Sequence, residues 1–255
     1  MNTTFRPHLL FCGLLAALLV GCAGAPARSP SPVPTIPVTP APTPLPSPSP
    51  SPRGTIDVTT PAQAAALVFA SDERWARISP PRPDLIGGST SFEAFEDGTG
   101  FAVKITVGQG DCQAGCIEKH TWQYHVDASG NVELVDDSGD DVVVPPATGG
   151  DGPARVTALL NAGPVCPVET IPPDPNCAPR AVANAEVTLY DADGNEVDTA
   201  TSDEDGKVTF DVEAGAYYVV VQPVEGLMGT PEAQPFSALG GDQVELLFGY
   251  DTGIR

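Results

Sequence analysis

The hydrophobic and polar positions of this chain fall into four segments that differ in their period. Residues 9–20 form an apolar run of about a dozen residues, the length of a signal-peptide core and too short for a membrane-spanning helix. Residues 26–52 are almost only Pro, Ser, Thr, Ala and Val, a composition that cannot bury a core. Helical and strand periods follow. We therefore predict a signal peptide over residues 1–21, a disordered proline-rich stalk over 22–54, and folded domains over 55–150 and 151–255.

The first folded segment starts with a helix signal. Thr60-Pro61-Ala62-Gln63 has the form of a capping box with proline at the first helical position. Apolar positions at helical spacing follow and form one face, and the pair Pro80-Pro81 predicts where the helix ends. That face consists of Ala64, Leu67, Val68, Ser71, Trp75 and Ile78.

After the helix the period changes to two, which predicts strands. The predicted strands cover residues 91–96, 100–108, 120–127 and 131–136. We predict an α+β domain with one helix on a four-stranded antiparallel sheet. In element order this arrangement resembles the small cystatin-like and PepSY-like modules.

The second folded segment has an all-β pattern. Its strand candidates alternate apolar and polar residues around Val187, Phe210, Val219 and Leu246. Between the candidates lie turns rich in aspartate and glycine, Asp191-Ala192-Asp193-Gly194-Asn195 and Asp203-Glu204-Asp205-Gly206. Short strands with regular turns over about a hundred residues predict a β-sandwich. The aspartate-rich turns also share the beginning of a calcium loop, but they lack its full spacing, so hairpin turns are the favoured interpretation.

Several of these motifs resemble the transthyretin-like, carboxypeptidase-regulatory-like domain. The motifs are Ala185 to Leu189, Asp191 to Gly194, Thr201 to Val208 and Glu213 to Val220. The resemblance implies a small β-sandwich over residues 151–255 that acts as an accessory domain. Its motifs say little about activity.

The residues Leu19-Val20-Gly21-Cys22 resemble the lipobox of a bacterial lipoprotein precursor. That resemblance implies cleavage before Cys22 and attachment of acyl chains such as palmitate through its thioether. Two acyl chains anchor a protein stably, so we expect a membrane-anchored protein on the extracytoplasmic side of the cell membrane. The alternatives are an ordinary secretory signal or an unprocessed membrane anchor.

Charge and histidine content narrow the classes of function. The chain has 33 acidic and 12 basic residues, a balance that repels nucleic acid. Its histidines are His8, His120 and His125, and none lies in the predicted sandwich, so a zinc peptidase there is not expected. No G-x-S-x-G, phosphate-loop or H-E-x-x-H motif occurs. We predict no enzyme, no cofactor and no metal.

Four cysteines remain after Cys12 and Cys22 are assigned to the signal and the anchor. Cys112 and Cys116 lie four residues apart near His120, a set that could hold a soft metal such as copper or form a disulfide in a tight loop. An oxidising compartment favours the disulfide. Cys166 and Cys177 bracket a proline-rich loop, and we predict a second disulfide there.

Taken together, the sequence indicates a non-enzymatic, lipid-anchored cell-surface protein. The expected role is binding or structural presentation, with the membrane and an extracytoplasmic protein or glycan as partners. Two alternatives stay open. One is a metal- or redox-handling lipoprotein that uses Cys112, Cys116 and His120, and the other is a protease-inhibitory module in the first folded domain.

Overall fold

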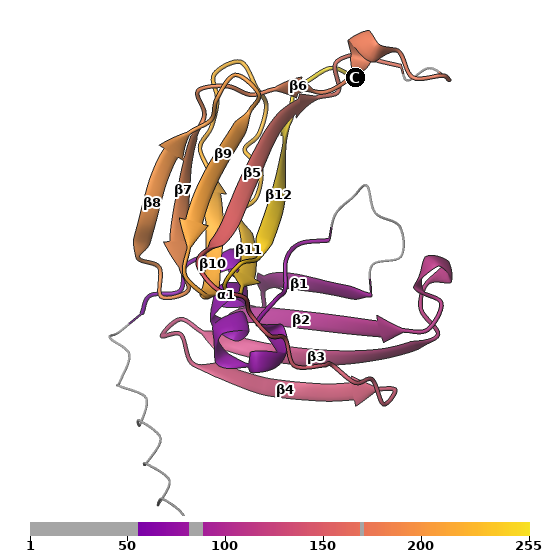
Figure 1. Ribbon diagram of the computed structural model, residues 1–255, viewed down its shortest axis with the longest axis vertical. Coiled ribbons are helices and arrows are strands. Elements are labelled where there is room, and N and C mark those ends of the chain that lie inside the picture. Colours follow the sequence, from indigo (N-terminus) through magenta and orange to yellow (C-terminus); the bar gives the residue numbers. More distant parts are fainter. Residues whose placement is uncertain (1–55, 82–88, 169–170) are drawn as a thin grey trace, which may run out of the picture. The chain divides into compact units, whose positions relative to one another are not determined.

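The computed structural model describes residues 56–81, 89–168 and 171–255. The predicted signal peptide, Cys22 and the proline-rich stalk lie outside the described residues. The described chain is mostly antiparallel β-sheet with one α-helix (Figure 1). No helix in the described part of the chain is long and apolar enough to cross a membrane.

The helix α1 (Pro61–Ser71) begins as the capping box predicts. The Thr60 hydroxyl accepts a hydrogen bond from the Gln63 amide, and the Gln63 side chain accepts one from the Thr59 amide. The predicted end at Pro80 is wrong. Asp72 adopts an extended backbone, and its carboxylate caps the short 3₁₀ helix η1 (Glu73–Trp75) by accepting the Arg74 amide. A local cap therefore ends the helix before the prolines are reached.

The first sheet is an antiparallel meander of four strands in sequence order (Figure 1). Its strands are β1 (Thr90–Glu96), β2 (Gly100–Gln109), β3 (Glu118–Asp127) and β4 (Val132–Gly139). All four strands were predicted, with bounds that differ by at most three residues. One face of the sheet buries aromatic and branched side chains against α1, and the other face is polar. We call these the inner face and the outer face.

The connection between β2 and β3 of the first sheet contains the 3₁₀ helix η2 (Cys112–Ala114). Two further sheets form the β-sandwich. One sheet is antiparallel, with β11 (Gln234–Ala238), β10 (Gly215–Val221), β7 (Glu186–Asp191) and β8 (Glu196–Thr201) in that order. The other is built on β5 (Ala154–Gly163), which pairs in parallel with β12 (Gln243–Asp251) and antiparallel with β6 (Arg180–Ala181) and β9 (Lys207–Val212). A short 3₁₀ helix, η3 (Pro175–Cys177), precedes β6.

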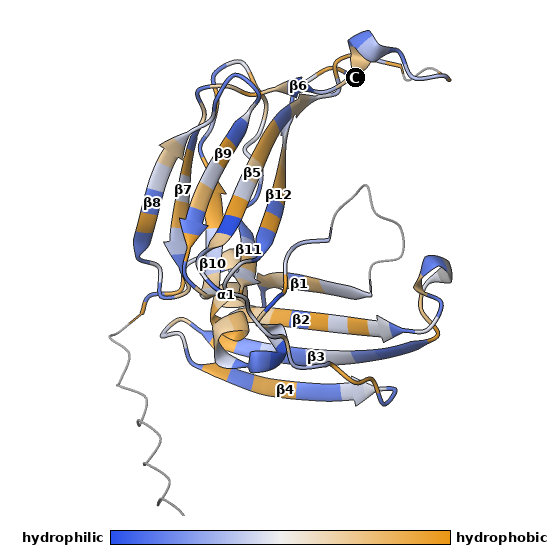
Figure 2. Ribbon diagram, viewed as in Figure 1, coloured by the Kyte–Doolittle hydropathy of each residue, from blue (hydrophilic) through white to orange (hydrophobic). Residues whose placement is uncertain are grey.

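The helix α1 is buried on all sides, which differs from the single apolar face that the sequence predicts. Every residue from Ala62 to Phe69 is buried. The reason is that α1 contacts β1 and β2 and also β10 and β11 of the sandwich. A helix that is apolar all round is typical of a fully enclosed position, and Figure 2 shows little hydrophilic colour along it.

The strand β10 is buried on both of its faces. Val219 and Val221 belong to the core between the two sandwich sheets, whereas Ala216 and Tyr218 belong to the core around α1. The continuous apolar run of β10 fits this position, because a strand covered on both faces does not alternate. The separation into domains at residue 150 stays a prediction.

Candidate functional site

The loop between β2 and β3 lies against the outer face of the first sheet, and a disulfide joins two of its residues. Cys112 and Cys116 are bonded, with their Cα atoms 3.7 Å apart. Gly115 ends η2 in the left-handed region, at φ 110°, and donates its amide to the Cys112 carbonyl. The predicted disulfide is therefore present at this loop.

A glycine in β2 makes room for this loop. A Cβ atom placed on Gly108 would lie 2.3 Å from the Cys116 Sγ atom. The sulfur thus lies directly on the sheet at a position where any other residue would displace it. The disulfide forms one wall of an open cleft at this end of the outer face.

The cleft has a volume of about 370 Å³, and its lining combines polar and apolar groups. Three hydroxyl groups, from Ser89, Ser91 and Thr106, line it together with Gln113 and Lys119. The side chains of Gln113 and Lys119 make no hydrogen bond to another described residue. This arrangement offers hydrogen-bond donors and acceptors to a ligand.

His120 does not join the two sulfurs. Its Nε2 atom lies 2.5 Å from Oδ1 of Asp137, and its Nδ1 atom lies 2.5 Å from the Asp140 carbonyl oxygen. The ring stacks on Trp122 with centroids 4.2 Å apart. The hydrogen bond to the Asp140 carbonyl, followed by the one to Asp137, raises the pKa of His120. Both ring nitrogens are thus occupied by protein oxygens.

An ionic and aromatic cluster that the sequence analysis missed lies next to His120 on the inner face. The Arg74 guanidinium forms a bidentate pair with Asp72, from Nε to Oδ1 and from Nη2 to Oδ2, and lies 5.0 Å from the Trp122 ring centre. The Tyr124 hydroxyl donates to Asp72 and accepts from the Trp75 indole at 3.0 Å. Burial raises the pKa of Tyr124 to about 12. Every polar group of this cluster has a partner, which indicates a structural role.

The pKa of Asp72 is lowered in this cluster. Burial alone would raise it, but hydrogen bonds from the Arg74 side chain and backbone and from Tyr124 outweigh that effect. The sequence does contain a signal for this cluster, because the charged residues of Asp72-Glu73-Arg74-Trp75 immediately follow an apolar helix. The prediction that the helix continues to Pro80 placed these residues inside the helix, so the cluster was missed.

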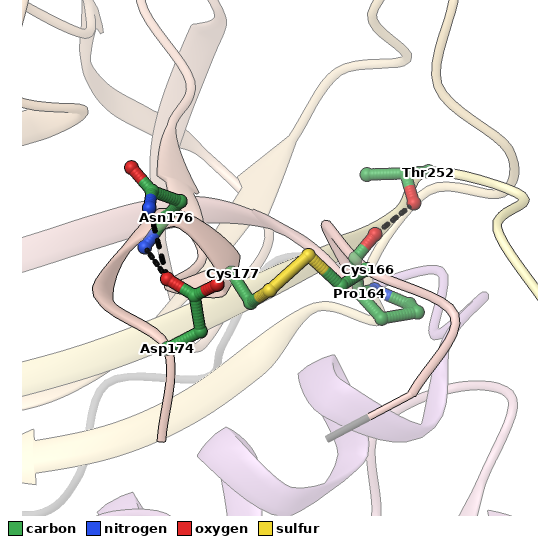
Figure 3. The surroundings of a disulfide bond; sticks show 6 residues. All are labelled: Pro164, Cys166, Asp174, Asn176, Cys177 and Thr252. Atoms are coloured by element: carbon green, nitrogen blue, oxygen red, sulfur yellow. Dashed lines mark hydrogen bonds between the residues drawn. A yellow bond between two sulfur atoms is a disulfide. The ribbon is translucent and has the colours of Figure 1, made fainter. Parts of the chain in front are cut away.

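The second disulfide joins Cys166 to Cys177, with Cα atoms 5.2 Å apart (Figure 3). It closes the proline-containing loop ahead of β6, as predicted. The Asp174 carboxylate caps η3 by accepting the Asn176 amide at 2.9 Å, and the Thr252 hydroxyl donates to the Pro164 carbonyl (Figure 3). The residues just before this loop are thus bonded to the segment that follows β12.

The remaining predicted candidates are part of turns. In three turns, an aspartate carboxylate accepts the amide four residues later, at 2.8–3.0 Å. The turns from Asp127 to Asn131 and from Asp191 to Asn195 join paired strands and are hairpins, as predicted for the Asp191 segment. The turn from Asp203 to Lys207 instead joins β8 to β9, which lie in different sheets, so the predicted hairpin there is wrong. His125 lies on the outer face, 2.7 Å from Asp97 of another turn. Within the described residues, no group of three or more His, Cys, Asp or Glu side chains is placed to hold a metal ion.

Comparison with known proteins identifies the fold of the second segment. Residues 178–226 match the SpaA prealbumin-like fold domain. These residues include β6 to β10, so the sandwich is a prealbumin-like, and hence transthyretin-like, β-sandwich. The match is to this domain, whereas the sequence motifs pointed to the carboxypeptidase-regulatory-like group of the same fold.

No curated protein matches the chain. Among solved structures, the Bacillus anthracis TIE protein is similar, with a TM-score of 0.31 and 15% identity over 67% of this chain. The match covers 32% of that protein, so this chain spans about a third of its length.

Proposed function

We propose that this protein is a non-enzymatic, lipid-anchored cell-surface protein that presents the outer face of its first sheet to a ligand. The prealbumin-like fold supports a surface or structural module. Two disulfides support an extracytoplasmic compartment, because cytosolic thiols are kept reduced. The lipobox at Cys22 and the acidic composition support the same location.

The observation that carries the proposal is the way in which α1 joins the first sheet to the sandwich. Its two sides contact strands of both, and the segment after it is bonded to β11. Arg77 of that segment also forms an ion pair with Asp242, just before β12. These contacts make the sandwich a firm support for the sheet, which suits presentation of a binding face.

The contacts of His120 favour this function over metal handling. A copper site needs free sulfur and imidazole ligands. Here the two sulfurs are bonded to each other, and the imidazole is held by Asp137 and Asp140. The cysteines and the histidine of this alternative therefore have structural partners.

The anchor is tested by Cys22→Ser in the full chain expressed in a bacterial host that has the lipoprotein pathway. A hydroxyl group cannot replace the thiolate in the thioether transfer, so labelling with an alkyne analogue of palmitate should be lost. Processing at the lipobox should also be blocked. Any variant chain from which the signal has been removed should leave the membrane and partition into the aqueous phase of a detergent separation.

Cys12→Ser is the matched control, because it changes the other cysteine of the N-terminal segment and should keep label and partitioning. If a Cys22→Ser chain with its signal removed still partitions with detergent, the anchor lies elsewhere.

A further inference from the structure

Hydroxyl side chains form a row across all four strands of the outer face. The strand register places Thr106 opposite Ser91 on one side and opposite Thr121 on the other, and Thr121 opposite Ser138. The hydroxyls of Thr106 and Thr121 lie 3.2 Å apart, and the Ser138 hydroxyl donates to the Asp136 carboxylate at 2.7 Å. We call Ser91, Thr106, Thr121 and Ser138 the hydroxyl row. Because neighbouring strands lie about 4.8 Å apart, the backbone positions of the row repeat at about that interval, while the Thr106 and Thr121 hydroxyls approach each other more closely.

The hydroxyl row leads into the cleft beside the Cys112–Cys116 disulfide. Ser91 and Thr106 belong to both the row and the cleft lining. The outer face thus carries the hydroxyl row and, at one end of it, the cleft, where Gln113 and Lys119 add an amide and an ammonium group. An extended ligand could lie along the row and place one unit in the cleft.

The lining indicates the chemistry of that ligand. Hydroxyl and amide groups both donate and accept hydrogen bonds, which matches a ligand that does the same at each unit. The described residues that line the cleft include no carboxylate, although the whole chain has a formal charge of −21. That net charge repels polyanions, and Lys119 repels cations. A neutral polyhydroxyl chain is compatible with both.

The repeat of the row indicates the shape of the ligand. In an extended, equatorially linked polysaccharide, one pyranose unit advances by a length close to the spacing of neighbouring strands. Successive sugar units could therefore lie over successive strand positions of the row. We propose that the outer face binds a neutral, linear polysaccharide that runs across β1 to β4 with one sugar in the disulfide-walled cleft. This rests on the proposed presentation function and names its ligand class.

Isothermal titration of the folded, disulfide-intact protein with a panel of neutral hexasaccharides tests the proposal. The panel comprises cellohexaose, chitohexaose, xylohexaose and mannohexaose, which differ in the groups that each sugar carries. At least one should bind. Thr121→Val and Gln113→Ala should each weaken that binding by about two- to tenfold, the effect of losing one hydrogen bond.

Thr209→Val is the matched control, because Thr209 is an exposed strand threonine of β9 in the sandwich. It should leave the affinity unchanged, and all three variants should keep the melting temperature of the parent within a few degrees. Polygalacturonate supplies the anionic comparison and should not bind.

Three results would overturn the proposal. They are failure of all four neutral probes, binding of polygalacturonate alone, and an affinity that Thr121→Val and Gln113→Ala leave intact. None of them bears on the lipid anchor, which palmitate labelling of Cys22 tests separately.

Discussion

The hydroxyl group of Ser237 donates a hydrogen bond to the backbone carbonyl oxygen of Trp75. The same hydroxyl accepts the Ile78 amide at 3.0 Å, and the Ser237 amide donates to the Ile78 carbonyl at 2.7 Å. The segment that follows α1 is thus bonded to β11, which is an edge strand of its sheet. Covering that edge protects it from pairing with another chain.

Ser237→Ala should destabilise the protein by about 1–3 kcal/mol, because it leaves the buried Trp75 carbonyl and Ile78 amide without this partner. Urea denaturation measures the change in the free energy of unfolding. Ser129→Ala is the control, since Ser129 lies in an exposed turn where its side chain makes no bond to a described residue, and it should change stability by less than about 0.5 kcal/mol. Equal effects of the two variants would contradict a bonding role for Ser237.

Limited proteolysis tests the predicted domain boundary. The chain from Asp140 to Thr148 has no regular structure and is largely exposed, so we expect cleavage there. The isolated fragment 151–255 should unfold cooperatively in a calorimeter, because the core between its two sheets is complete. Its melting temperature should be lower than that of the whole, since Ala216 and Tyr218 lose their cover. Loss of any cooperative transition would instead indicate one indivisible core.

Substitution of two glycines by alanine distinguishes the effect of backbone strain from that of a steric clash. Both Gly206 and Gly226 have positive φ, at 71° and 85°. A Cβ atom on Gly206 would lie 2.3 Å from the Leu160 carbonyl oxygen, whereas one on Gly226 would meet nothing within 4 Å. Gly226→Ala should therefore cost about 1 kcal/mol, and Gly206→Ala about 3 kcal/mol or more. Thermal unfolding of the two variants measures the difference, and similar melting temperatures would contradict it.

The raised pKa of His120 predicts how its contribution to stability depends on pH. A group whose pKa is higher in the folded state stabilises fully below its unfolded pKa of about 6.5 and loses that effect as the pH rises through the folded value. The groups that face the ring are Asp137, the Asp140 carbonyl, Trp122 and, with opposite effect, Arg74.

The melting temperature of the parent should thus exceed that of His120→Gln by more at pH 5.5 than at pH 8.5. Asp137→Asn should reduce this pH dependence, because it removes a carboxylate that favours the imidazolium. An advantage over His120→Gln that is constant across this range would show that the ring acts only through packing.

The sequence predicts local features of this protein better than contacts between distant segments. The start of α1 and the three aspartate turns depend on residues within five positions of one another, so their signals are complete in the sequence. The end of α1 depends on Asp72, whose carboxylate competes with the helix for the backbone, and the proline pair masked that signal. The second buried face of β10 depends on α1, about 150 residues away, although the unbroken apolar run from Ala216 to Val221 indicated it.

In the candidate site, too, local features could be predicted from the sequence, whereas contacts between distant segments could not. Both disulfides follow from cysteine spacing and compartment, and the polar outer face follows from strand alternation. The role of His120 does not, because Asp137 and Asp140 reach it only through the pairing of β4 with β3. The hydroxyl row needs the register of four strands, and a shift by one residue in any strand would break it.

The parallel pairing of β5 with β12 sets an order of events for the newly made chain. Val156 pairs with Val244, about 90 residues later, so the sheet that contains β5 stays open until β12 has arrived. Loop closure over that distance is slow, so one edge of β5 stays unpaired until then. Export through a membrane pore, which the proposed surface location requires, would benefit from this delay, because the sandwich closes only after β12 has left the pore.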